Sequence, residues 1–81
     1  MNWRNYIHTD PAILAGKPII KGTRLSVELI LERLANGWTE AMLLESYPTL
    51  SKEALPAVYA FMLETIRDDV FKIHDSLRQA S

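Results

Sequence analysis

Apolar residues recur with helical spacing from residue 26 onward. They stand one, three or four residues apart and fall on one face of a helix: Val27, Ile30, Leu31 and Leu34. Gly37 is suited to end this helix, because glycine readily adopts the left-handed conformation of a helix C-terminus. The pattern predicts a first helix over residues 26–36.

Capping residues indicate two further helices. Thr39 is suited to begin a second helix, and Pro48 ends it. Ser51 is suited to begin a third helix, with Pro56 about five residues inside it. Because that proline would remove one backbone hydrogen bond, we expect a slightly bent first turn. Two capped helices joined by a tight turn are typical of a helix-turn-helix.

The apolar spacing continues beyond the point where a three-helix unit would end. Six residues follow one another at intervals of 4, 3, 4, 3 and 4, and are called the seam: Tyr59, Leu63, Ile66, Val70, Ile73 and Leu77. They span about 28 Å of helix with heptad spacing. We expect this C-terminal helix to bind another chain, a second copy or a different protein, through Ile66, Val70, Ile73, Leu77 and Arg78. The alternative is that it folds back over its own core or over the N-terminal strands.

The first 24 residues are predicted to be extended. Short β-prone runs, Tyr6-Ile7 and Ile19-Ile20, are separated by proline and glycine. The segment from Gly16 to Arg24 predicts a β-hairpin arm that leads into the first helix. The chain is thus expected to form one mainly α domain over residues 1–81, with a β-arm (1–25), a trihelical helix-turn-helix core (26–65) and a C-terminal helical extension (66–81).

Composition limits the class of protein. An 81-residue chain with 48% hydrophobic residues can bury one modest core. The absence of cysteine is typical of a reducing compartment. No run approaches the roughly 20 apolar residues of a membrane span, and the start lacks the apolar stretch of a signal peptide. We therefore expect a cytoplasmic protein with no role at a membrane.

The net charge of -1 is unevenly distributed. Residues 1–24 contain four basic residues and one acidic residue, whereas residues 25–81 contain five basic and nine acidic residues. A basic arm and the start of a third helix could contact DNA, so the candidate DNA-binding residues are Lys17, Lys21, Arg24, Thr49, Ser51 and Lys52. Glu40, Glu45 and Glu53 oppose this, because a DNA-binding face usually carries several cations. A compact trihelical core that does not touch DNA remains the alternative.

Little in the sequence predicts catalysis. His8 and His74 lie far apart, without further ligands at the spacing of a metal site. The glycine pattern around a nucleophilic serine is also missing. We expect a binding module rather than an enzyme, with no metal and no cofactor.

Arg24 and the two tryptophans each allow two interpretations. A guanidinium just before a helix opposes the helix dipole, so Arg24 should be held by Asp10, by Glu28 or by turn carbonyls, or should contact a partner. Trp3 and Trp38 are expected to anchor or cover the core; exposed tryptophans would instead mark an interface.

Over about residues 5–62, the chain closely resembles the bacterial and archaeal domain-of-unknown-function family numbered 433. The residues that carry the resemblance are Asp10-Pro11-x2-Leu14-x-Gly16-Lys17-Pro18-x-Ile20-x-Gly22-Thr23-Arg24, Val27-x2-Ile30-Leu31, Gly37-Trp38-Thr39 and Tyr47-Pro48-x-Leu50-Ser51. The resemblance implies a homeodomain-like trihelical fold and the role of an antitoxin in a type II toxin–antitoxin pair. It also implies a toxin that resembles a PIN-domain ribonuclease.

These indications lead to one functional hypothesis and one alternative. We expect a homodimer that binds operator DNA and blocks the acidic metal cleft of a PIN-like toxin with its C-terminal helix, where Arg78 or another cation would enter the cleft. The alternative is a protein-interaction or homodimerisation module with no DNA role. The near-neutral net charge favours the alternative, and the helix-turn-helix spacing favours the first hypothesis.

Overall fold

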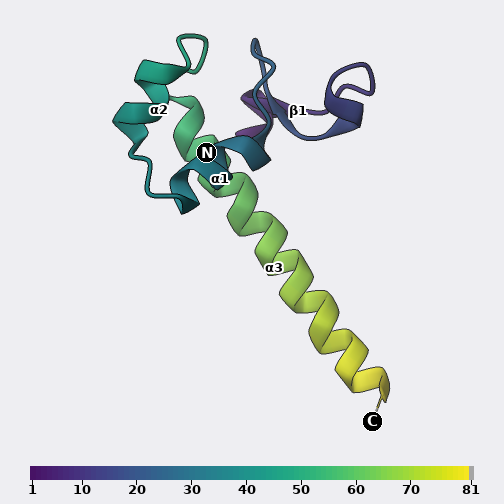
Figure 1. The fold of residues 1–81 in the computed structure, drawn as a ribbon. Helices are drawn as coiled ribbons and strands as arrows, with labels where there is room; N and C mark the ends of the chain where they lie inside the picture. The colour runs from purple at the N-terminus through teal and green to yellow at the C-terminus, as the bar shows by residue number, and fades with distance from the viewer. Residues whose placement is uncertain (81) are drawn as a thin grey trace.

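The protein is mainly helical, as predicted (Figure 1). The computed structural model describes the backbone of residues 1–80 and the side chains of residues 1–68. Within residues 1–80 there are three α-helices and one two-stranded antiparallel sheet: β1 (Ile7–His8), β2 (Ile19–Ile20), α1 (Val27–Ala35), α2 (Glu40–Ser46) and α3 (Ala54–Ala80). Short 3-10 helices η1 (Trp3–Asn5) and η2 (Leu14–Gly16) complete the N-terminal part.

Side-chain caps set the starts of the first two helices. The Ser26 hydroxyl accepts a hydrogen bond from the backbone N–H of Leu29 at 2.9 Å. The Thr39 hydroxyl does the same for the N–H of Met42 at 3.2 Å. Each bond satisfies one of the N–H groups that lack a partner in the first turn of a helix. Both helix starts are confirmed.

Gly37 ends α1 in the predicted manner. Its φ of 91° lies in the left-handed region. Its N–H donates to the carbonyl of Leu34 at 3.1 Å, and the N–H of Trp38 donates to the carbonyl of Arg33 at 3.0 Å. These two bonds form a Schellman motif, which turns the chain sharply towards α2.

The start of α3 differs from the prediction. The helix begins at Ala54 and not directly after Ser51, because residues 52–53 form a turn. Pro56 is therefore the third residue of the helix, where an N–H would have no partner within the helix. The expected loss of a hydrogen bond therefore does not arise, and the bent first turn stays a prediction.

The N-terminal strands belong to the core and do not form a projecting arm. Ile7 lies opposite Ile20, and His8 lies opposite Ile19. Ile19 is completely buried, and Ile7 and Ile20 are 3% exposed. Only one part of the predicted hairpin is observed. After β2 a tight turn reverses the chain, and Ser26 forms a single β-bridge with Ile19. The sequence predicted a boundary between a β-arm and a helical core near residue 25. In the structure, residues on both sides of this position belong to one core.

The core forms where the strands, α1 and α2 meet the first turns of α3. Its buried apolar residues are Ile7, Ile19, Ile20, Val27, Ile30, Leu43, Leu50, Ala54, Leu55, Ala57 and Val58. Trp3 and Trp38 are partly buried and pack against this cluster, which confirms their predicted role as its cover. The small residues Ala54 and Ala57 allow neighbouring segments to lie close to α3.

The distal half of α3 leaves the core (Figure 1). The helix is continuous to Ala80, and neither glycine nor proline follows Pro56 to interrupt it. The C-terminal segment therefore continues straight on, and the alternative in which it folds back over its own domain is not realised.

Candidate interaction surfaces

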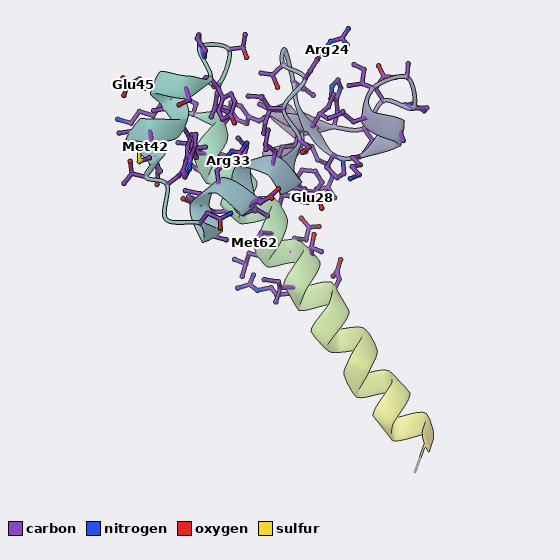
Figure 2. All side chains as sticks on the ribbon, viewed as in Figure 1. Arg24, Glu28, Arg33, Met42, Glu45 and Met62 are labelled. Atoms are coloured by element: carbon purple, nitrogen blue, oxygen red, sulfur yellow. The ribbon has the colours of Figure 1, made fainter. Side chains whose placement is uncertain are left out.

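Five of the six candidate DNA-binding residues lie in two turns at the end of the molecule opposite the C-terminus (Figure 1). These five exposed residues are called the cationic end: Lys21, Arg24, Thr49, Ser51 and Lys52. Figure 2 shows Arg24 pointing outward from this end. The first turn follows β2, and the second joins α2 to α3, so the cationic end is drawn from two distant parts of the sequence.

Lys17 does not belong to this group. Its ammonium lies 3.0 Å from a carboxylate oxygen of Glu28 on α1, and the two side chains are 59% and 72% exposed. The pair is worth little in stability because water screens it. The positive charge of Lys17 is nevertheless balanced locally, which makes this lysine a weaker candidate for binding phosphate than the other cations.

The predicted brace of Arg24 is not found. Within residues 1–68, Arg24 makes no side-chain hydrogen bond or ion pair with Asp10 or Glu28. Asp10 accepts the N–H of Ala12 at 2.9 Å, and Glu28 is bound to Lys17. Both expected partners thus have other contacts, and the guanidinium extends into solvent.

The near end of the seam is exposed on α3. Tyr59, Leu63 and Ile66 are 39%, 47% and 50% exposed. They lie within about 80° of the buried Leu55 around the helix axis, and they become exposed because α3 extends past the core. The side chains of the remaining predicted partner-binding residues lie outside the described part of the structure: Val70, Ile73, Leu77 and Arg78.

Tyr59 connects this seam to α2. Its hydroxyl donates a hydrogen bond to a carboxylate oxygen of Glu40 at 3.2 Å. Partial burial raises the pKa of Tyr59, and the charge and hydrogen bond of Glu40 raise it further. The contact fixes the seam's first residue against the start of α2, a link that heptad spacing does not reveal.

A cluster of side chains ties the N-terminus to α3. The indole N–H of Trp3 donates to Glu64, and the guanidinium of Arg4 lies 3.5 Å from the same carboxylate. Trp3 also meets the ring of Phe61 edge to face, with 4.9 Å between centroids. The bond from Trp3 holds the pKa of Glu64 below its ordinary value, and Arg4 adds to this shift. Sequence analysis missed this cluster because its members are about sixty positions apart.

A second aromatic cluster covers the junction of α1 and α2. The rings of Trp38 and Tyr47 are stacked, with 6.3 Å between centroids and 18° between planes. The Arg33 Nε donates to the Tyr47 hydroxyl at 3.3 Å, and its guanidinium carbon lies 5.3 Å from the Trp38 centroid. This hydrogen bond raises the pKa of Arg33. The cluster holds the Gly37 turn against the end of α2.

An open apolar groove runs along α1 on the side of Phe61, with a volume of about 490 Å³. Its floor is formed by Pro18, Val27, Leu31, Ala35 and Phe61. Lys17, Glu28 and Glu32 line its rim. The groove and the seam lie on opposite sides of α3, because Leu63 is about 200° around the helix from Phe61.

Among the described residues, no helix combines the length and apolar character needed to cross a membrane. No group of three or more histidine, cysteine, aspartate or glutamate side chains there is arranged to hold a metal ion.

Comparison with known proteins places this fold in a family. The chain is 34% identical over 59 residues to the uncharacterized protein y4eO of Sinorhizobium fredii; the match covers 70% of this chain and 27% of that protein. The chain thus spans about a quarter of the length of this relative. A crystal structure of a DUF433 member from Anabaena variabilis superposes with a TM-score of 0.72 at 25% identity, covering 88% of this chain and 70% of the other. The family model described as "Protein of unknown function (DUF433)" matches residues 7–62. The chain is therefore a member of the DUF433 family.

Proposed function

We propose that this chain is the antitoxin-like component of a type II toxin–antitoxin pair. In this proposal α3 binds protein partners, among them a PIN-like ribonuclease toxin, and the cationic end contacts operator DNA. The two activities would then use opposite ends of one small domain (Figure 1). The mechanism would be occlusion of the toxin and not chemistry on a substrate.

The observation that carries this proposal is the helix that continues beyond its own core. Leu63 and Ile66 are about half exposed, and the backbone of α3 remains helical to Ala80. Exposed apolar side chains at regular spacing on a projecting helix are typical of a docking element. Against a PIN-like nuclease, such a helix would cover the acidic metal cleft, and Arg78 would supply a cation to it.

For the DNA contact we propose that α2 and α3 act as the helix pair of a homeodomain-like unit. The start of α3 would approach a major groove, with Thr49, Ser51 and Lys52 near bases or phosphates. Lys21 and Arg24, in the turn after β2, would contact the flanking backbone. Dimerisation would make this contact bivalent and would offset the small number of cations.

One observation favours the alternative, a protein-interaction module with no DNA role. Lys17 is paired with Glu28, so Lys21, Arg24 and Lys52 are the cations left among the predicted DNA-binding residues. Glu53 directly follows Lys52 and is also exposed. An affinity that depends on so few phosphate contacts would be low in a monomer.

Co-expression with the product of the adjacent gene tests the toxin contact. We expect the two proteins to co-purify through size exclusion and the ribonuclease to be inhibited in the complex. Arg78→Glu should weaken this inhibition, because it reverses the charge offered to the acidic cleft. Lys17→Ala, which removes an already balanced cation, serves as the control. Absence of a complex with a folded, active ribonuclease would remove the toxin–antitoxin assignment.

A salt titration tests the DNA contact. Binding of operator duplex should weaken with salt, and Lys52→Ala or Lys21→Ala should each lower the slope of log affinity against log salt by about one unit. Lys17→Ala should leave the slope unchanged, because Glu28 already balances that charge. Unchanged binding of operator and random duplex by both test variants would show that these cations do not contact DNA and would favour the alternative. No binding of duplex by the dimer at low salt would favour it as well.

A further inference from the structure

The exposed seam continues α3 beyond the point where the core ends. Leu55 is buried in the core, and Ile66, eleven residues further on, lies only about 20° from it around the helix axis. Each residue turns an α-helix by about 100°, so Leu63 lies about 200° and Ile66 about 140° around the axis from Phe61. Phe61 packs against the core, whereas Leu63 and Ile66 are about half exposed. The domain's own core therefore leaves the seam uncovered.

The seam is narrow as well as exposed. After Leu63, the described side chains of α3 other than Ile66 are polar: Glu64, Thr65, Arg67 and Asp68. A helix that packs on a globular surface usually presents an apolar stripe at least about 100° wide, whereas helices of a coiled coil meet along two positions of each heptad. Met62 lies about 40° from Ile66 and widens the stripe next to the core, so it is the heptad spacing of the seam that favours a helix as the partner.

The spacing of the seam continues on one uninterrupted rod. The backbone of α3 is helical as far as Ala80. Positions 70, 73 and 77 are valine, isoleucine and leucine in the sequence and extend the intervals that begin at Tyr59. Their side chains lie outside the described part of the structure. These positions lengthen the seam to about 28 Å.

We propose that the occupant of this seam is the seam of another copy of the chain. The intervals 4, 3, 4, 3 and 4 are the same from either end. In a parallel pair each seam residue lies opposite its own equivalent. In an antiparallel pair Tyr59 lies opposite position 77, Leu63 opposite 73 and Ile66 opposite 70. Such a surface complements itself in both directions, as an isologous interface requires.

The charge of α3 and the exposure of the seam are compatible with a second copy of the chain as the partner. From Tyr59 to Ala80 the helix contains three basic and four acidic residues, so two copies approach without strong repulsion. The core of the domain packs around the first turns of α3 and leaves Leu63 and Ile66 about half exposed. The inference rests on the proposed use of α3 as a docking helix, and it names the partner at the seam; a toxin would then contact other faces of the assembled helices.

Sedimentation equilibrium of the full chain tests the proposal. The monomer mass is 9.2 kDa, and we expect a multiple of it. Ile66→Asp should raise the dissociation constant at least about a hundredfold, because it places a charge inside the interface. Thr65→Asp adds the same charge one residue away on the polar face, and it should retain the mass of the unmodified chain. Both positions lie outside the core, so circular dichroism should show unchanged helix content.

The outcomes separate this proposal from the proposed function. A chain that is monomeric at about 0.1 mM, or variants of Ile66 and Leu63 that keep the full mass, would overturn self-association through the seam. Equal dissociation by Thr65→Asp would also overturn it. A monomer that still binds the ribonuclease would refute this inference and leave the proposed function intact. An oligomer that binds neither ribonuclease nor DNA would support self-association through the seam and would refute the proposed antitoxin function.

Discussion

Substitution of Trp3 by alanine is the most direct test of whether the N-terminal segment belongs to the core. Trp3 packs edge to face on Phe61 of α3, and its indole donates to Glu64. Trp3→Ala would remove both contacts and leave β1 and β2 in place. A projecting arm would tolerate this change, whereas a segment that completes the core would not.

The magnitude follows from the contacts that are lost. Trp3 is partly buried, so roughly half of the transfer free energy of a large apolar side chain is at stake, or about 1–2 kcal/mol. The edge-to-face pair with Phe61 adds about 0.5–1.5 kcal/mol. The bond to Glu64 adds little, because water screens that exposed carboxylate. The free energy of unfolding should therefore fall by about 1.5–3.5 kcal/mol, a large share of the stability of a small domain.

Urea unfolding followed by far-UV circular dichroism measures this change, since the signal does not depend on the deleted tryptophan. Arg4→Ala is the matched control. It removes the ion pair at 3.5 Å and the guanidinium that lies 4.3 Å from the Trp3 ring centroid, both at an exposed side chain, so it should lower the midpoint much less than Trp3→Ala. If Trp3→Ala unfolds at the same urea concentration as Arg4→Ala, the N-terminal segment contributes no core packing and the structural argument fails.

Three further predictions follow from the same structure. A chain truncated after Thr65 keeps every buried core residue, so it should remain folded by circular dichroism and sediment as a monomer; unfolding would show that the extension stabilises the core. The hydrogen bond from Trp3 has the largest effect in holding the pKa of Glu64 below its ordinary value of 4.5, and Arg4 lowers it further. A lowered folded pKa means that the stabilisation is complete above the unfolded value and is lost as pH falls through the folded value. Urea midpoints of the unmodified chain and Glu64→Gln should thus differ by a small amount at pH 7, because the carboxylate is exposed, and should converge in acid below 4.5; a constant difference would contradict this. Gly37→Ala should cost about 1–2 kcal/mol, measured by thermal unfolding, because φ is 91° there; no loss would mean that the turn relaxes.

Local signals predicted the helical part of this fold well. Ser26, Thr39 and Gly37 fixed three helix ends, because capping depends on residues within one turn of the helix. The exposed start of the seam was also predictable, since heptad spacing and helix geometry determine which side chains share a face. The start of α3 was placed too early because a turn and a helix N-terminus use the same residue types.

Contacts between distant residues were not predictable from the sequence. Each strand has only two residues, too few to show an alternating pattern, so nothing indicated that Ile7 and Ile20 pair inside the core. The contact of Trp3 with Glu64 likewise has no local signature. For the cationic end, the sequence supplied the candidates, but only the fold showed that Lys17 is paired with Glu28 and is separate from the others.

The continuity of α3 bears on how its distal half can bind. An isolated helix of about 16 residues is marginal in water, because its first turn is costly to form. Here the turns from Ala54 to Phe61 are already ordered by the core, so they act as a permanent nucleus for the residues that follow. A partner thus encounters a segment whose backbone entropy has largely been lost during folding, and less of the contact energy is spent on ordering it. A peptide of residues 66–81 should consequently compete poorly with the full chain for any partner of the seam.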